Sequence, residues 1–306
     1  MTDRLKAGVA GAGVFGGYHA NKYVEAEGAD LVAIYDHDLG RAMEGAAKHE
    51  GAQAFDSFAD FLAAVDVVTI ATPATTHASL AMQAIDAGKH VLVEKPIALD
   101  VYDADELILA AAKAGVFIQV GHQERYVAEA FGLFDRDLPQ KVQSRRLNKY
   151  SPRAGDVSVV FDLMIHDLDL LAQLTSSSVA TIVSVDWRKE KSEFADYVDV
   201  TVDVAGVQAR LMASRLEETP LRDLTITYAD GEVALNFLER SVTNTTPVEV
   251  AADFGAAELP PALKDPLAFG TQSFLDAVRS GTDPKVPGLA GRRALAMAVK
   301  IEEALI

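Results

Sequence analysis

The run FDLMIHDLDLL, residues 161–171, places three aspartates and one histidine in an otherwise apolar stretch. Its apolar residues recur at helical spacing, which predicts a half-buried helix. On such a helix Asp162, His166 and Asp169 share one stripe, because residues three and four apart are neighbours. Ionisable side chains are seldom buried without a partner or a function, so this stripe is a candidate site.

Three interpretations of the stripe are open. A metal site would need a third firm ligand, and the sequence offers none at matched spacing. A structural histidine capped by Asp169 is the second interpretation. The third is acid–base chemistry, in which His166 accepts a hydroxyl proton and a nearby carboxylate sets its tautomer. We favour the third and expect no metal, because the other parts of a hydride-transfer site occur earlier in the chain.

A glycine-rich loop follows the first apolar strand. Gly11, Gly13 and Gly16 fit the pattern G-x-G-x-x-G, which gives a tight turn, close approach of a pyrophosphate and close helix–strand packing. Val14 and Phe15 begin the following helix, whose N-terminal N–H groups would face the phosphates. The pattern predicts a dinucleotide site at these five residues.

An aspartate ends the second predicted strand, ADLVAIYDHD. Asp36 lies about 20 residues past the glycines, where a carboxylate holds a ribose hydroxyl. A carboxylate there repels a 2′-phosphate, so the sequence favours NAD over NADP. Arg41 is a nearby cation that a 2′-phosphate would attract, and it leaves NADP as the alternative.

Two further apolar strands, at 67–71 and 90–94, are separated by a helix and predict a parallel sheet covered on both faces. Ligands of such sheets bind beyond the carboxyl ends of the strands. The candidate cofactor residues at those ends are Thr72, Pro73, His77, Glu94 and Lys95. Gln123, where the first domain ends, is a further cofactor candidate. His77 opens a helix and is equally explained as its cap. A lysine between a buried strand and a proline is an uncommon structural choice, so Lys95 is predicted to be functional.

The second half of the chain changes pattern. Segments 181–190, 197–214, 224–237 and 241–251 alternate polar and apolar residues, with hairpin turns at Ala205-Gly206 and Ala229-Asp230-Gly231. They predict an antiparallel sheet with one free face. Helices return from about residue 265. We therefore expect an NAD-binding domain at 1–122 and a substrate-binding and oligomerisation domain at 123–306, whose last helices can pack back on the first.

Composition excludes several classes of partner. A formal net charge of −17 over 306 residues repels nucleic acid and anionic lipid. There are no cysteines, hence no disulfides and no thiolate zinc site. No apolar run is long enough to span a membrane, and no signal peptide is evident, so we expect a cytoplasmic protein that acts on a small molecule.

A basic cluster interrupts this acidic background. It consists of Arg145, Arg146, Lys149 and Arg153, and Arg125 is a further candidate. A phosphorylated substrate would explain such a cluster, because guanidinium groups match phosphate oxygens. The solvated face of a strand explains it equally well.

The segments GVAGAGVFG, DVVTIATPATTH, GKHVLVEKPIALD and FDLMIHDLDLL together resemble the glucose–fructose oxidoreductase, inositol dehydrogenase and related (Gfo/Idh/MocA) family. The resemblance spans the whole chain. It implies an α/β protein with an N-terminal Rossmann domain and a second domain whose open, mostly antiparallel sheet forms a homodimer or homotetramer interface. It also implies that Lys95 and His166 are catalytic and that Asp162 orients the substrate.

The stretch SPRAGDVSVVFDLMIHD, with GHQERY upstream, lacks the glycine-rich run of many family members. It is most similar to the subgroup that acts on UDP-N-acetylhexosamines, which implies NAD-dependent oxidation at C3 of a sugar such as UDP-N-acetylglucosamine. A dehydrogenase of free inositol or aldoses is the alternative. A silent, NAD-binding regulatory homologue is a further one, although such a protein has no need of Lys95 and His166.

Overall fold

The computed structural model of the protein describes residues 4–151 and 155–305 and divides the chain into two compact units. The first unit contains residues 1–123 and 265–291, and the second contains residues 124–264 and 292–306. The boundary expected between residues 122 and 123 therefore differs by one position. Segment 265–291, which sequence analysis counted with the second domain, belongs to the first unit.

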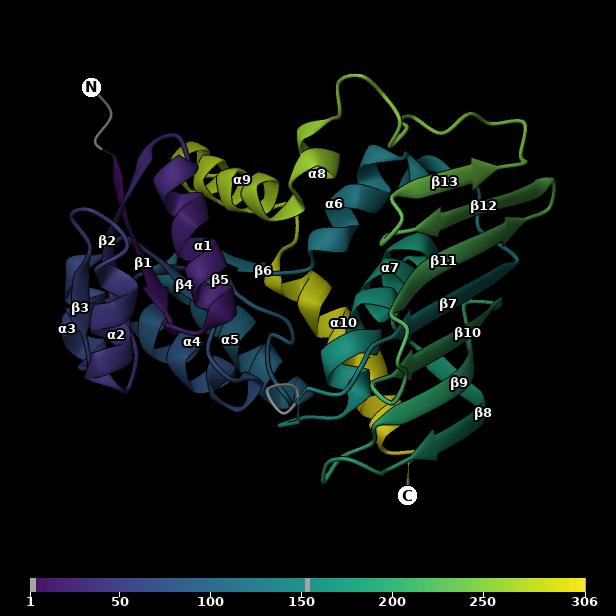
Figure 1. Ribbon diagram of the computed structural model, residues 1–306, viewed down its shortest axis with the longest axis horizontal. Helices are drawn as coiled ribbons and strands as arrows, with labels where there is room; N and C mark the ends of the chain where they lie inside the picture. Colours follow the sequence, from purple (N-terminus) through teal and green to yellow (C-terminus); the bar gives the residue numbers. More distant parts are fainter. Residues whose placement is uncertain (1–3, 152–154, 306) are drawn as a thin grey trace. The chain divides into compact units, whose positions relative to one another are not determined.

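The first unit is built on a six-stranded parallel sheet (Figure 1). Its strands are β1 (Leu5–Ala10), β2 (Ala29–Tyr35), β3 (Gln53–Phe55), β4 (Val67–Ile70), β5 (His90–Val93) and β6 (Ile118–Val120). Their spatial order is β3-β2-β1-β4-β5-β6. The connections run outward in opposite directions from β1 and β4, so the switch point of the sheet, where ligands bind in such folds, lies between these two strands.

Helices cover this sheet. They are α1 (Val14–Glu25), α2 (Leu39–Ala46), α3 (Phe58–Ala64), α4 (His77–Asp86), α5 (Val101–Ala114) and, from late in the chain, α9 (Pro266–Ser280). Residues of α1 and α9 share one core with β1 and β2, which explains why segment 265–291 belongs to the first unit. Right-handed crossovers in opposite directions place α4 and α5 on the other face from α1.

The second unit contains a seven-stranded sheet in the order β13-β12-β11-β7-β10-β9-β8. The strands are β7 (Lys141–Leu147), β8 (Ala180–Arg188), β9 (Tyr197–Val204), β10 (Val207–Ser214), β11 (Leu221–Tyr228), β12 (Gly231–Asn236) and β13 (Ser241–Asn244). Neighbours are antiparallel except the pair β7 and β10. Ala205 and Gly206 have φ of 55° and 85°, the two positive values that a tight hairpin turn requires.

One face of this second sheet carries the core of the unit. In β9 every second residue is buried and the intervening ones are partly exposed. The helices of the unit are α6 (Gln123–Ala130), α7 (Ile165–Thr175), α8 (Pro261–Lys264) and α10 (Gly288–Glu302), which begins in the first unit. Figure 1 shows α6, α7 and α10 on the same side of the strands. Among the described residues, no helix combines the length and apolar character needed to cross a membrane.

Two buried ion pairs fix α7 against its surroundings. Asp167 accepts hydrogen bonds from Nε and Nη2 of Arg146 on β7, at 2.6 and 2.9 Å. Asp169 accepts one at 2.9 Å from Nε of Arg125 on α6. Arg146 also pairs with Glu124. Since 167 and 169 lie on either side of 166 around the helix, these pairs set the direction in which His166 leaves α7.

Arg146 and its chain neighbour Arg145 provide a matched test of burial. Arg145 pairs with Asp223 at the surface, whereas Arg146 is 2% exposed. We expect Arg146→Met to lower the free energy of unfolding by about 3–5 kcal/mol, because inside the protein Asp167 loses its arginine, while Glu124 loses Arg146 and keeps its ion pair with Arg222. Arg145→Met should cost less than about 1 kcal/mol. Urea denaturation of both variants measures the difference, and equal losses would contradict this role of Arg146.

Candidate functional site

The strands of the first sheet end together at one edge, where backbone hydrogen bonds join the following loops to the neighbouring strands. The Gly11 N–H donates to the carbonyl of Tyr35 at 2.7 Å, and the Glu94 N–H donates to that of Ile70 at 2.9 Å. The predicted residues of the first domain all follow strands at this edge. The tertiary fold therefore brings the glycine-rich loop, Asp36 and the Glu94-Lys95 turn to one side of the sheet, as parallel strands require.

The glycine-rich loop is closed by contacts that leave no room for side chains. Gly11 has φ of +103°, and a Cβ built on it would lie 2.6 Å from the carbonyl oxygen of Ala71. A Cβ on Gly16 would lie 1.7 Å from the carbonyl oxygen of Gly11. Gly11 thus makes the sharp turn, and Gly16 lets α1 pack directly on it.

The N-terminus of α1 fits a pyrophosphate. Its cap residue Gly13 makes no side-chain hydrogen bond, and no acidic residue occupies the first turn. By contrast, α2, α5 and α9 are capped by Asp38, Asp100 and Asp265. The nearest atom to a Cβ built on Gly13 would be Nη2 of Arg41, 3.9 Å away. Uncapped N–H groups at the positive end of a helix dipole suit an anion.

Asp36 ties the end of β2 to this loop. The side chain is 5% exposed, its Oδ2 accepts the N–H of Ala12 at 2.9 Å, and its Oδ1 accepts the N–H of Asp38 at 3.1 Å. Each carboxylate oxygen has two lone pairs, so acceptor capacity remains for a ribose hydroxyl. Nε of Arg41 lies 3.9 Å from Oδ2, which places a cation beside the carboxylate.

In the turn after β5, Lys95 is partly exposed between buried neighbours. These neighbours are Glu94 and Pro96, and the Lys95–Pro96 peptide bond is cis. His77 braces this turn, since its Nδ1 and Nε2 lie 2.7 and 2.9 Å from the carbonyl oxygens of Pro96 and Thr72. Burial lowers the pKa of His77. The structure thus directs both ring nitrogens of His77 to the protein backbone, rather than to a cofactor.

The remaining predicted cofactor residues differ in exposure. Val14 and Phe15 are about half exposed, at 47% and 50%. Pro73 is exposed, and Thr72, whose hydroxyl accepts from Thr76 at 2.7 Å, is partly exposed. Gln123 is partly exposed, and its Nε2 donates to Oε1 of Glu94 at 3.1 Å.

Sequence analysis missed His19, which is 1% exposed and whose Nε2 lies 2.7 Å from Oε1 of Glu94. The buried residues of α1 are Gly16, His19, Ala20 and Tyr23. This is helical spacing, so the apolar periodicity of α1 could have placed His19 on the inward face. An ionisable residue on an inward face predicts a buried partner.

In the second unit, the predicted helix presents a narrow edge. Between Phe161 and Ala172, only Phe161, Asp162 and His166 are partly exposed, and all the other residues are buried. Asp162 lies in a π-helical turn, Val160–Met164, that precedes α7. The expected single α-helical stripe is therefore wrong in detail. Asp169 belongs to the buried pair with Arg125, so it does not cap His166.

No cluster of three or more His, Cys, Asp or Glu side chains could hold a metal within residues 4–151 and 155–305. The acids nearest to His166 in sequence show why, because Asp167 and Asp169 direct their oxygens to arginines. Asp162 and His166 are left as the ionisable residues at the partly exposed edge of this helix.

The basic cluster does not gather into one pocket. Arg145 and Arg146 point to opposite faces of β7 because side chains alternate along a strand. Nε and Nη1 of Arg125 bond Asp169 and Gln173, so Arg125 has a structural contact rather than the predicted substrate contact. Lys149 is 68% exposed and lies 2.6 Å from Glu218 at the surface. Arg153 lies outside the described residues.

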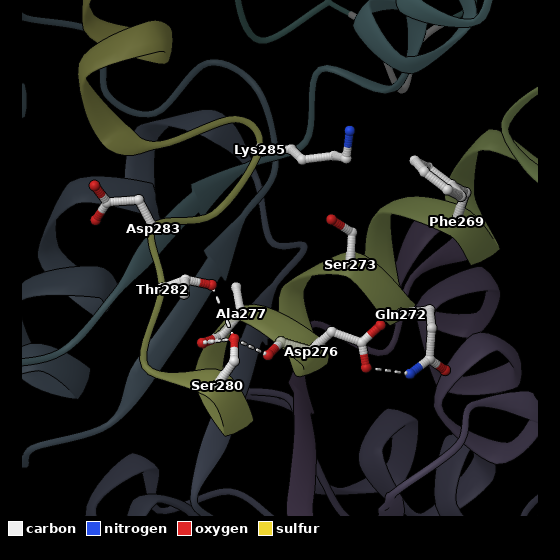
Figure 2. Close-up of a pocket in the computed structure, with 9 residues that line it drawn as sticks. All are labelled: Phe269, Gln272, Ser273, Asp276, Ala277, Ser280, Thr282, Asp283 and Lys285. Atoms are coloured by element: carbon white, nitrogen blue, oxygen red, sulfur yellow. Dashed lines mark hydrogen bonds between the residues drawn. The ribbon is translucent and has the colours of Figure 1, made fainter.

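A surface cavity of about 380 Å³ is present elsewhere in the first unit. Figure 2 shows it between α9 and the turn that follows this helix, with Ser280 hydrogen-bonded to Thr282. None of its lining residues is a predicted site residue. The cavity is therefore separate from the site residues described above.

Comparison with known proteins gives matches over the first unit and over the whole chain. Residues 5–122 match the sequence profile of an oxidoreductase family with an NAD-binding Rossmann fold. The chain is 34% identical to UDP-N-acetylglucosamine 3-dehydrogenase of Acidithiobacillus ferrooxidans, an alignment covering 98% of this chain and 97% of that protein. A solved structure of that enzyme matches with a TM-score of 0.85 at 33% identity, covering 98% and 97% of the two chains.

Other relatives are less similar. Inositol 2-dehydrogenase 4 of Saccharopolyspora erythraea is 33% identical, but the alignment covers 60% of this chain and 58% of that protein. The WlbA dehydrogenase of Bordetella pertussis, solved with NADH and UDP-GlcNAcA, matches with a TM-score of 0.83 at 20% identity, covering 100% and 97% of the two chains. At that identity the likeness concerns the fold alone.

Adjacent glycines test the pyrophosphate loop. We expect Gly16→Ala to weaken NAD binding at least tenfold, or about 1.4 kcal/mol, because the new methyl group collides with the backbone of Gly11. Gly17→Ala is the control, since a Cβ there meets no atom within 4 Å and alanine favours the helix. Fluorescence titration with NAD measures both. If the two variants bind NAD with equal affinity, the glycine-rich loop does not bind the cofactor.

Proposed function

Because the chain belongs to the Gfo/Idh/MocA family of oxidoreductases, which have an NAD-binding Rossmann fold, we propose that it oxidises C3 of UDP-N-acetylglucosamine or a related UDP-N-acetylhexosamine with NAD. The observation that carries this proposal is the 34% identity, over 98% of the chain, to an enzyme of that name. The inositol dehydrogenase relative matches 60% of the chain.

The cofactor would be held by the edge of the first sheet. The N–H groups at the start of α1, including those of Val14 and Phe15, would bind the pyrophosphate above Gly13. Asp36 would accept a hydrogen bond from the adenosine ribose, since its position beside the loop is fixed by the Ala12 N–H. We assign the nicotinamide half to the loops that carry Thr72, Pro73 and Gln123, because they follow β4 and β6, the strands on either side of β5, at the carboxyl edge of the sheet.

Oxidation of a secondary alcohol removes a hydride from carbon and a proton from oxygen. Bound NAD supplies the acceptor for the hydride. His166 would take the hydroxyl proton, and Asp162, on the same partly exposed edge, would orient the substrate. Lys95 would place its ammonium group at the substrate oxygen, where it stabilises the negative charge that develops as the proton leaves.

The UDP portion would meet the cations that the protein does not use internally. Lys149 is such a cation, because its carboxylate partner Glu218 is 81% exposed and the pair is weakly held in water. We retain Arg153, four residues further along the chain, as the second. Arg125 and Arg146 are left out, because both guanidinium groups are committed to buried carboxylates.

A dehydrogenase of free inositol or an aldose is the second candidate. The identity to inositol 2-dehydrogenases over more than half of the chain favours it. A silent regulatory homologue is the weaker alternative, because Lys95, Asp162 and His166 all remain partly exposed in their buried surroundings.

We also propose a homodimer or homotetramer that forms through the second sheet. β8, an edge strand of this sheet, carries exposed apolar side chains, with Val183 59% and Trp187 36% exposed. Exposed apolar side chains on an edge strand are typical of a surface that pairs with another subunit.

We expect NAD to bind at least tenfold more tightly than NADP, or by about 1.4 kcal/mol, because the carboxylate of Asp36 repels a 2′-phosphate. Asp36→Asn should narrow this gap, since it removes the charge and keeps an acceptor for the Ala12 N–H. Arg41→Met should weaken NADP binding and leave NAD binding unchanged. Calorimetric titration provides the affinities, and equal wild-type affinities for the two cofactors would exclude Asp36 from this role.

The substrate is tested with a panel of UDP-sugars, free hexoses and inositols, following NADH by its absorbance. We expect the highest kcat/KM for a UDP-N-acetylhexosamine, and a product trapped by an aminotransferase specific for 3-keto sugars. Lys95→Ala and His166→Ala should each lower kcat on the order of 10²-fold or more, with NAD affinity within a few-fold. Preference for free inositol or glucose over every UDP-sugar would overturn the substrate assignment, and normal turnover by either variant would overturn the catalytic one.

A further inference from the structure

A histidine–carboxylate pair lies buried in the first unit and has no part in the chemistry proposed above. His19 is 1% exposed and Glu94 is 6% exposed. Nε2 of His19 on α1 lies 2.7 Å from Oε1 of Glu94, the residue after β5. The pair therefore connects the helix that begins at the glycine-rich loop with the residue that directly precedes Lys95.

The carboxylate of Glu94 joins further segments. Its Oε1 also accepts from Nε2 of Gln123 at 3.1 Å, and its Oε2 accepts the backbone N–H of Lys95 at 3.3 Å. A Cβ built on Gly121 would lie 2.7 Å from Oε1, so the end of β6 is packed directly against the carboxylate. One side chain thus holds α1, the lysine turn and the chain leaving β6.

His19 favours the ionised form of Glu94 in this position. Burial alone raises the pKa of the Glu94 carboxyl, but the hydrogen bond and charge of His19, together with the charge of Lys95, bring it below its usual value. The other ring nitrogen of His19, Nδ1, is buried and has no hydrogen-bond partner among the described residues. The ring is therefore placed for its single bond to Glu94, at the cost of one unsatisfied polar atom.

We propose that His19 is a positioning residue for Lys95: it fixes the Glu94 carboxylate, which in turn fixes the backbone of the lysine turn. The inference rests on the proposed function, in which Lys95 acts at the substrate oxygen. It adds that the helix that binds the pyrophosphate also sets the position of the lysine. Displacement of a catalytic group by about 1 Å can cost on the order of 10²-fold in rate, so a buried contact of this kind can control turnover.

The main test is His19→Leu, which fills the buried position with an apolar side chain of moderate size and removes the hydrogen bond to Glu94. We expect kcat to fall about tenfold or more, with sugar KM and NAD affinity within about threefold, because Lys95 is displaced while the binding residues remain. His19→Gln supplies an amide donor to Glu94 and should recover much of the loss.

The pH dependence separates positioning from a merely structural role. The ionised Glu94 carboxylate accepts the Lys95 N–H more strongly than the neutral carboxyl would, and the pKa of Glu94 rises when His19 is removed, because only the charges of Lys95 and His77 then offset burial. The acid limb of the kcat–pH profile should therefore move to higher pH in His19→Leu. In a Glu94→Gln background, His19→Leu should add little further loss, because both changes act through the same contact.

His90 provides the matched control. It begins β5, the strand that Glu94 follows, and its Nδ1 accepts the N–H of Phe117 at 3.1 Å. His90→Leu removes a structural hydrogen bond at the opposite end of the same strand. It should lower the Tm and leave kcat and its pH profile unchanged. Equal effects of His90→Leu and His19→Leu on kcat would overturn the proposal.

A measurement without substrate keeps this inference distinct from the proposed function. In protein labelled with ¹⁵N-lysine, the amide signal of Lys95 is identified by its loss in Lys95→Ala. We expect this signal to shift in His19→Leu and to stay in place in His90→Leu. If the wild-type protein oxidises no sugar, the proposed function is wrong. If the amide signal of Lys95 has the same chemical shift in His19→Leu as in the wild type, the positioning role of His19 is wrong.

Discussion

A buried carboxylate must accept hydrogen bonds from donors in the protein, and this constraint fixes the structure within each of the two candidate sites. Asp36, Glu94, Asp167 and Asp169 are all at least nine-tenths buried. Each one accepts from a segment distant in sequence, so each ties together parts of the chain that carry functional residues. In this protein the buried charges position the exposed ones.

In the first unit the constraint operates at the carboxyl edge of the parallel sheet. Asp36 secures the glycine-rich loop through the Ala12 N–H. The start of α1 has no side-chain cap, so its N–H groups can bind an anion. Glu94 secures the turn that presents Lys95. The parallel arrangement brings these loops to one edge, and the buried carboxylates then determine the path of each loop over that edge.

In the second unit the same constraint determines which ionisable residues of one helix are available for chemistry. Asp167 and Asp169 are drawn inward by Arg146 and Arg125, and the helix is clamped on two sides. Asp162 and His166 are left on the partly exposed edge. Asp162 lies in the π-helical turn before α7, whereas His166 lies in the regular α-helix. Such π-helical turns are frequent at functional sites.

The sequence by itself determined the features that rest on local chemistry. Glycine spacing predicted the loop after β1, apolar strands alternating with helices predicted the parallel sheet, and turn residues predicted the hairpins of the second sheet, all as found. The family, the oxidoreductase class and the cofactor were also recognised from short motifs, because those residues lie close together along the chain.

Tertiary structure alone decided which charged residues are committed to each other. Asp167 and Asp169 pair with arginines 21 and 44 positions away, and His19 pairs with Glu94 across 75 positions. A local pattern carries no information on such pairs. The apparent basic cluster was divided in a similar way, because β7 turns its successive arginines, Arg145 and Arg146, to opposite faces of the sheet. The parallel neighbour of β7 in this sheet is β10, which comes about 60 residues later in the chain. Pairing of this kind depends on which segments meet in space, and only the folded chain determines that.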